Sequence, residues 1–232
     1  MPSTAIVGTP DWNQPAKLTV AIALSLLCMV AVADDDGFCN VDTSCDSNVE
    51  LPTATDCATD DCACAQQIQC VITNSSPDDN WSTIPTGDLH WNAFFWHTRF
   101  LETYVSPAGE DAFHAALDPA QPMTPLPAGT ILYKAGYDPI DGEPGDPDID
   151  QGAEVFVAAK LEGDYCPSEY EINGSCQGGG WFWYMADYTA SDTDPFFSAW
   201  GKPDKCTACH NTAERGDWML SLDIQRAYPP QP

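Results

Sequence analysis

The sequence predicts a mainly β, α+β fold in which an antiparallel sheet carries one or two short helices and follows a cysteine-rich segment. Three short runs of β-branched and aromatic side chains, at residues 130–134, 155–160 and 181–185, lie between Gly, Pro and Asp clusters, as is typical of antiparallel strands. The 232-residue chain also contains 20 prolines and 16 glycines, which oppose long helices. A sheet with short helical additions is therefore expected.

Two short helices are expected ahead of the first of these strands. One is predicted to start at Asp88, a capping residue, because apolar side chains recur after it at roughly helical spacing. These are Trp91, Phe94, Phe95 and Leu101. The other is predicted to start at Ser106-Pro107, where a capping hydroxyl precedes proline at the first helical position, and to run toward Leu117.

Composition divides the chain into three segments. An apolar run at residues 18–33 follows Lys17 and ends in small residues before an acidic stretch, which is typical of an export signal with its cleavage site. We expect a signal peptide at 1–33, a disulfide-rich acidic segment at 34–80 and a folded domain at 81–232. The run is too short for a confident membrane span, so we expect a periplasmic or secreted protein without stable membrane insertion.

Cysteine usage agrees with an oxidising compartment. Apart from Cys28 and a pair near the carboxyl terminus, eight cysteines remain, an even number suited to disulfides. They are Cys39, Cys45, Cys57, Cys62, Cys64, Cys70, Cys166 and Cys176. The first six predict a small disulfide knot or a tethered tail with fifteen pairings left open, and metal binding by four of them is the alternative. A Cys166–Cys176 bridge is expected to pin a long hairpin loop.

The charge of the chain narrows the classes of partner. With 35 acidic and 8 basic residues, the net charge is −27, which repels phosphate backbones and anionic lipid headgroups. We therefore expect no nucleic-acid partner. A solvated acidic surface is the simplest interpretation of the charge.

The most specific motif is Cys206-Thr207-Ala208-Cys209-His210, which has the spacing of a c-type haem attachment site. Two intervening residues let both thiols add to the vinyl groups of one porphyrin, and the adjoining imidazole then falls under the iron. We expect one covalent haem c, with thioethers at Cys206 and Cys209 and His210 as the axial ligand. A disulfide between these cysteines and half of a zinc site are the alternatives, although the other histidines, His90, His97 and His114, are isolated.

The position of the motif bears on the kind of cytochrome. Only 22 residues follow His210, which excludes a methionine sixth ligand a long stretch later, and Met219 is the only methionine downstream. Four-helix cytochromes also carry the motif near the carboxyl terminus, but the predicted strands oppose that fold. A β-sheet cytochrome remains.

Residues 81–224 resemble the cytochrome P-460 family, which includes the cytochromes c-prime-beta. The resemblance rests on four segments. They are residues 126–134, with a proline-glycine turn and a lysine-ending strand; the aromatic strand at 180–183; residues 201–204 before the haem motif; and 217–221, where an aromatic other than Trp218 is more usual. It implies an antiparallel β domain, often dimeric, with a five-coordinate haem open to hydroxylamine or nitric oxide.

The resemblance implies two functions. Hydroxylamine-oxidising members carry a lysine bonded to the porphyrin, for which Lys134 is the candidate and Lys160 a weaker one, and they pass electrons to an acceptor that we expect to be another cytochrome. Members without the crosslink bind nitric oxide or carry electrons without turnover. The chain is thus expected to be a haem oxidoreductase, or alternatively a non-catalytic cytochrome. A third hypothesis, without haem, is a disulfide-rich adhesion or scaffold domain.

Each candidate side chain also has a structural interpretation. Lys134 shares a strand face with Leu132 and would have a lowered pKa if buried, but it is equally a lysine that protects an edge strand. Glu102 and Arg99 are candidate distal polar groups for proton transfer, or ordinary surface residues of the first helix. Lys202 and Lys205 are candidate partners of the haem propionates, or only balance local charge.

Overall fold

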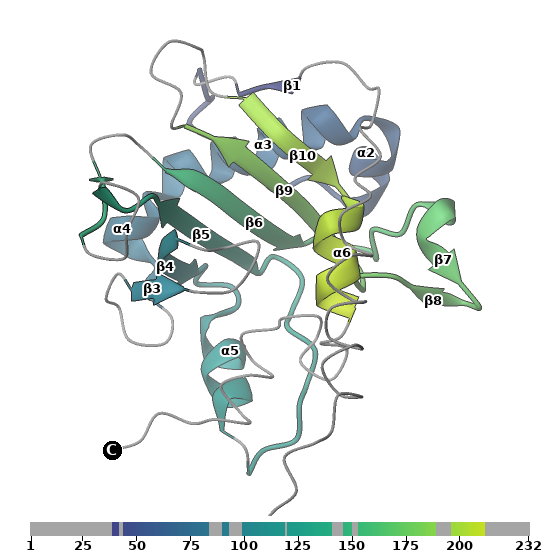
Figure 1. Cartoon of the computed structure of the whole chain (residues 1–232). Helices are drawn as coiled ribbons and strands as arrows, with labels where there is room; N and C mark the ends of the chain where they lie inside the picture. Colours follow the sequence, from purple (N-terminus) through teal and green to yellow (C-terminus); the bar gives the residue numbers. More distant parts are fainter. Residues whose placement is uncertain are drawn as a thin grey trace, which may run out of the picture. The chain divides into compact units, whose positions relative to one another are not determined.

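The computed structural model describes residues 39–41, 44–83, 90–92, 99–118, 120–140, 146–149, 153–188 and 196–211. Their elements (Figure 1) are β1 (Cys39–Asn40), α2 (Ala54–Thr59), α3 (Asp61–Ser75), α4 (Pro77–Asn80), β2 (Ser82–Thr83), β3 (His90–Asn92), β4 (Arg99–Val105), α5 (Glu110–Leu117), β5 (Ile131–Tyr137), β6 (Glu154–Lys160), η4 (Ser168–Tyr170), β7 (Glu171–Ile172), β8 (Ser175–Cys176), β9 (Trp181–Asp187), β10 (Phe196–Gly201) and α6 (Asp204–His210). The expected signal peptide lies outside the described residues.

The main sheet is antiparallel, as predicted. Its strand order is β1-β10-β9-β6-β5-β4-β2, with β3 also paired to β4. The three predicted strands correspond to β5, β6 and β9, and β7 pairs with β8 in a separate hairpin. Among the described helices, none has the length and apolar character needed to span a bilayer.

The predicted helix from Asp88 to Leu101 is wrong, because β3 and β4 occupy its two ends. Aromatic and β-branched side chains that match a helical spacing over one turn also suit a pleated surface, and pairing with β5 decides the outcome. The second predicted helix exists as α5 but starts at Glu110. Ser106 does not cap it, since its hydroxyl accepts a hydrogen bond from the Ile131 amide at 2.8 Å.

The sheet has two faces with different coverings. Successive strand residues point to opposite faces, and directly paired residues share one. The face that includes Ile131, Ala159 and Phe182 packs against α2 and α3, and we call it the α3 face. The face that includes Leu132, Ala158 and Trp183 packs against α5 and Cys206 of α6, and we call it the α6 face. Figure 1 shows α3 behind the sheet and α6 in front of it.

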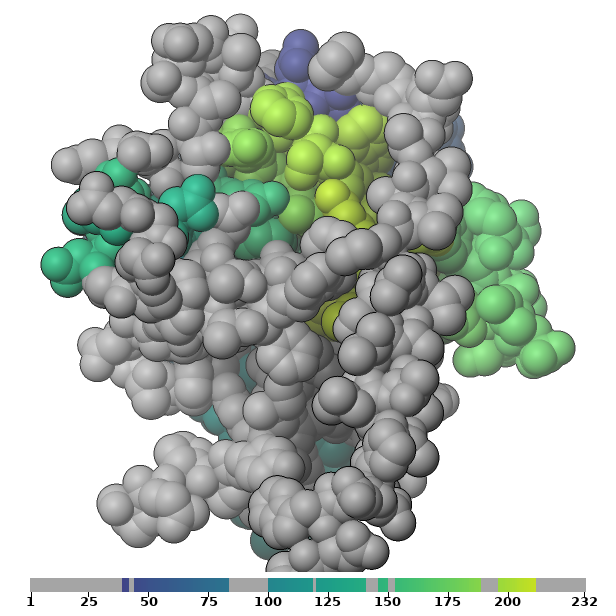
Figure 2. Space-filling view, viewed as in Figure 1, coloured from purple at the N-terminus to yellow at the C-terminus, as the bar shows by residue number. Residues whose placement is uncertain are grey.

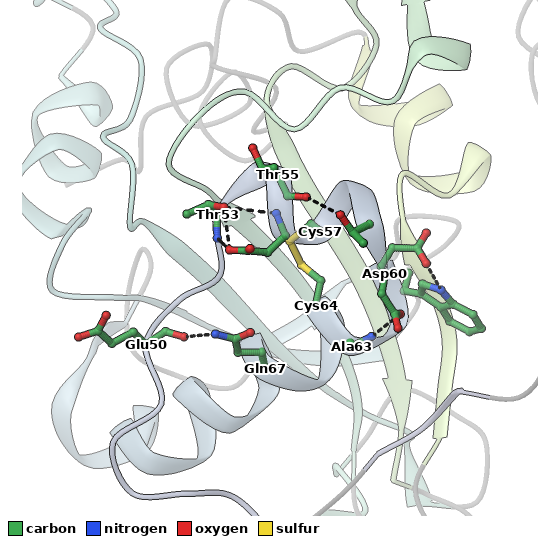
Figure 3. Close-up of a disulfide and its surroundings, with 12 residues drawn as sticks. Glu50, Thr53, Thr55, Cys57, Asp60, Ala63, Cys64 and Gln67 are labelled. Carbon is green, nitrogen blue, oxygen red and sulfur yellow. Dashed lines mark hydrogen bonds between the residues drawn. A yellow bond between two sulfur atoms is a disulfide. The ribbon is translucent and has the colours of Figure 1, made fainter.

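The cysteine-rich segment forms helices and shares the core of the sheet, so the expected knot or tail does not describe it. Its bridges are Cys39–Cys62, Cys45–Cys70 and Cys57–Cys64, the last of which joins α2 to α3 (Figure 3). Thr53 and Asp56 form a capping box that starts α2, and Asp60 caps α3. Ile68 of α3 is fully buried, and the sheet supplies the apolar surface that this segment lacks by itself.

Candidate haem-attachment site

Helix α6 brings the three motif side chains to one side. Cys206, Cys209 and His210 occupy positions i, i+3 and i+4, which share one face of a helix. All three are half-buried, whereas Thr207 points inward and is buried. The order of thiol, thiol and imidazole along a single helical face is the arrangement that two thioether bonds and one axial ligand require.

The two motif thiols differ from the other described cysteines. Eight cysteines pair in four disulfides, including the expected Cys166–Cys176 bridge, and neither Cys206 nor Cys209 takes part in any of them. Cys206 packs against the apolar cluster of the α6 face, and burial of its sulfur raises the pKa of the thiol to about 12. The structure therefore does not contain the alternative disulfide within the motif.

Two tryptophans of β9 lie beside the motif. The His210 ring is 4.4 Å from the Trp183 ring, centroid to centroid, at an interplanar angle of 52°. Trp181 lies 6.3 Å from Trp183 and, like it, is buried. Neither indole N–H has an acceptor among the described residues, although buried donors are nearly always paired. Sequence analysis identified this aromatic strand but gave no role to its indoles.

The buried Lys202 anchors the segment that leads into α6. The Lys202 ammonium donates to the carbonyl oxygens of Gln177 at 2.9 Å and Gly179 at 2.5 Å, and it lies 5.9 Å from the Tyr165 ring centroid. Burial, followed by the charge of Lys160, lowers the pKa of Lys202 to about 7. The expected pairing of Lys202 with a propionate therefore competes with two backbone carbonyls that hold this ammonium inside the protein.

The loop that supplies these carbonyls also holds the end of α6. The Gly178 amide donates to Oδ1 of Asn211 at 2.7 Å, and a Cβ on Gly178 would lie 3.0 Å from Thr207. The φ of Gly178 is +71°, a conformation that favours glycine. The Cys166–Cys176 bridge closes the segment immediately before these residues, and the β7–β8 hairpin within that segment stands at the surface (Figure 2, green). The glycine run at 178–180 was the only sequence signal for this contact.

The structure places Lys134 on the same face as the motif. Lys134 pairs with Thr103 and Phe156 and lies two residues from Leu132, so its side chain is on the α6 face. Burial of the ammonium lowers its pKa to about 8, and no charged group contributes to that shift. Strand β5 lies between β4 and β6, so the interpretation as an edge-strand lysine is wrong. The Lys160 ammonium lies 5.1 Å from the Trp181 ring centroid on the same face.

The structure places Glu102, one of the two candidate distal groups, on the face opposite the motif. Glu102 pairs with Ala135 and lies two residues from Tyr104, which places it on the α3 face. Burial of the Tyr104 hydroxyl is the main cause of its raised pKa, and the Glu102 carboxylate adds to that rise. Arg99 and His90 are described only as backbone of β4 and β3, and His97 and Met219 lie outside the described residues. His114 is exposed on α5.

The comparisons with known proteins leave the family open. No protein-family model matches the chain, and no curated protein matches it significantly. Within the described ranges, no three His, Cys, Asp or Glu side chains converge to hold a metal ion by themselves. The residues of the α6 face nevertheless fit a haem, because two thiols outside the disulfides, an imidazole and two indole donors without acceptors lie beside apolar surface.

Proposed function

We propose that the chain is an exported c-type monohaem protein whose porphyrin is attached through Cys206 and Cys209 and whose iron is bound by His210. One observation carries the proposal: these two thiols share a helical face with an imidazole, while the other eight described cysteines form disulfides. The haem would supply redox chemistry toward a small nitrogen compound.

The chain's own residues would orient and tune the group. Trp183 packs on the His210 ring and limits its rotation, and Lys202 with the 177–179 loop fixes the helix that carries both thiols. Trp181 and Trp183 belong to the apolar cluster that Cys206 packs against, so their rings would supply apolar surface beside the porphyrin. These contacts would set the position of the iron before any substrate arrives.

Oxidation of hydroxylamine is the activity that we propose for this site, with an acceptor such as another cytochrome taking the electrons. The position of Lys134 supports this choice, since it is on the α6 face and its pKa is lowered to about 8. Roughly a tenth of such a lysine is neutral at pH 7, and only the neutral amine has a lone pair for bonding. Its bond to the porphyrin would replace one amine N–H and one porphyrin C–H with a C–N bond, and the two electrons released would pass to the same acceptor. A non-catalytic protein that binds nitric oxide or carries electrons is the second candidate.

The attachment is tested by absorption spectra and intact mass after denaturation. The protein, expressed with haem-attachment machinery, should retain one haem mass, while Cys206→Ser and Cys209→Ser should each leave pigment that is partly or wholly extractable. The double variant Cys45→Ser/Cys70→Ser is the matched control, because it removes two thiols of the α3 face and should keep the haem. Colourless wild-type protein would overturn the proposal in favour of a scaffold domain.

The activity is tested separately at Lys134. We expect Lys134→Met to shift the ferrous absorption band and to abolish hydroxylamine consumption, whereas Lys205→Arg, which keeps the charge beside the motif, should change neither. An unaltered spectrum in Lys134→Met would exclude the crosslink. Nitric oxide binding without hydroxylamine consumption by the wild-type protein would favour the non-catalytic candidate. We also propose that the chain forms a homodimer, which sedimentation of the haem-loaded protein tests.

A further inference from the structure

A cavity lies on the α3 face of the sheet, opposite the face that carries the haem motif. Its volume is about 320 Å³, at the lower end of the range for ligand sites. Residues from α3, α4, β5 and β6 line it, together with the chain next to β1, β6 and β9. They are Val41, Gln69, Ile72, Thr73, Pro77, Asp78, Tyr133, Ala153, Val155 and Tyr188. None of them takes part in the proposed haem site.

The floor of the cavity is apolar, and its buried amide is already occupied. Ile72 and Val155 are each 2% exposed. The side-chain oxygen of Gln69 accepts from the Tyr184 hydroxyl at 2.7 Å, and its NH₂ donates to Thr73 at 3.2 Å. An entering group therefore meets hydrocarbon at the bottom, and Gln69 has limited capacity left for recognition.

The remaining polar groups of the lining favour a positive charge. Asp78, an exposed carboxylate on α4, contributes to the raised pKa of Tyr133, after burial and the nearby phenols of Tyr137 and Tyr188. Burial raises the pKa of Tyr188 to about 12, so both lining phenols stay neutral at physiological pH. None of the described residues that line this cavity is Lys, Arg or His, and the chain carries a net charge of −27. The face of a neutral tyrosine ring also attracts cations.

We propose that this cavity binds a small organic ammonium ion. The charged nitrogen lies beside Asp78 and the rings of Tyr133 and Tyr188, and the hydrocarbon body lies on Ile72 and Val155. An inorganic cation fits less well, because Ca²⁺ and Mg²⁺ require several oxygen ligands and the floor supplies carbon. An anion would lie beside a carboxylate without a compensating cation.

The experiment is calorimetric titration of the haem-loaded protein with phenethylammonium and, as a matched probe of opposite charge, 3-phenylpropionate. We expect phenethylammonium to bind and phenylpropionate not to bind. Asp78→Asn should weaken binding about threefold, as expected for an exposed ion pair, and Tyr188→Leu about two- to fivefold. Asp79→Asn, a change at the next residue of α4, which does not line the cavity, should bind as the wild type does.

Equal affinity for both probes, or equal weakening by Asp78→Asn and Asp79→Asn, would overturn the proposal. Absence of heat with phenethylammonium at millimolar concentration would do the same. The Cys206→Ser variant should bind phenethylammonium unchanged, because the cavity and the motif are on opposite faces of the sheet. A negative binding result therefore does not bear on the proposed haem attachment. If attachment fails, ammonium binding to the cavity can still be measured.

Discussion

The two faces of the sheet are built from alternate residues of the same strands, yet they differ in how completely their polar groups are satisfied. On the α3 face, three disulfides hold the helices, and the buried Gln69 and Tyr184 are hydrogen-bonded to each other. On the α6 face, two buried indoles have no acceptor among the described residues, and Lys134 has a lowered pKa. The buried polar groups of the α3 face are thus satisfied within the protein, whereas two indoles of the α6 face are not satisfied by the described residues.

The largest expected effect comes from the apolar contacts of α5 on the α6 face. Phe113 is fully buried there, so Phe113→Ala should lower the free energy of unfolding by about 3–5 kcal/mol. It should also alter the fluorescence of the neighbouring tryptophans. Ile68→Ala on the α3 face should cost about 2–5 kcal/mol without that optical change. Urea titration gives both values, and the exposed neighbour His114→Ala is the control. If Phe113→Ala lowered the free energy of unfolding no more than His114→Ala does, the contacts of α5 on the α6 face would not contribute to stability as expected.

The second-largest effect is expected from the disulfides, whose removal should affect the two faces of the sheet differently. Cys45→Ala/Cys70→Ala opens a bridge across 25 residues and should lower the free energy of unfolding by about 2–4 kcal/mol, while haem attachment is retained. Cys166→Ala/Cys176→Ala opens a shorter loop of 10 residues and should cost somewhat less. It should nevertheless lower the yield of attached haem, because Gln177 and Gly179, whose carbonyls hold Lys202, directly follow Cys176. Equal attachment yields in both double variants would remove the functional role given to this loop.

Lys202 should show a smaller effect with a characteristic pH dependence. Lys202→Met leaves the carbonyls of Gln177 and Gly179 without their donor and should cost about 1–3 kcal/mol. The pKa of Lys202 falls from 10.5 to about 7 on folding, so above pH 7 the unfolded chain binds more protons. Stability of the wild type should therefore rise between about pH 7 and 9, with Lys134 adding to the rise from about pH 8.

Urea midpoints at several pH values measure this slope. The rise should be smaller in Lys202→Met, whereas Lys205→Met should keep the wild-type slope. A Lys202→Met variant with the full slope would show that another group produces it. A wild-type stability that falls with rising pH in this window would contradict the sign of both lysine shifts.

The smallest predicted effect is local to the α3 face. Thr53→Ala removes the hydroxyl that accepts from the Asp56 amide at the start of α2 and should cost about 1 kcal/mol. Thr55→Ala, inside the same helix, should change the free energy of unfolding by less than about 0.5 kcal/mol. Haem attachment should be the same in both variants. A lower attachment yield in Thr53→Ala would show that the two faces are coupled.

Patterns within short segments predicted some elements and misled at others. The runs that became β5, β6 and β9 combine β-branched and aromatic residues with flanking Gly and Pro, and each signal is contained in about seven residues. The stretch around Trp91 has helix-like spacing, but sheet pairing determines its outcome. Trp91 pairs with Phe100 of β4, and β4 in turn pairs with the more distant β5. Tertiary pairing overrode the local spacing there.

The candidate site divides in the same way. The motif and its helix span adjacent residues, so sequence alone identified Cys206, Cys209 and His210 as a set. Lys134 was correctly assigned to the face of Leu132, because side-chain alternation is local. Two other contacts of the site join segments that are distant along the chain, and no local pattern encodes them. They are the hydrogen bond from Lys202 to the Gly179 carbonyl and the packing of Trp183 on His210.

The sequence by itself determined the antiparallel strands, the Cys166–Cys176 bridge and the composition of the motif, because each follows from residues that are close along the chain. Only the tertiary structure decided which of fifteen pairings the first six cysteines adopt and that Glu102 and Lys134 lie on opposite faces. The physical reason is that side-chain direction depends on strand register, and cysteine pairing depends on how α2 and α3 pack on the sheet.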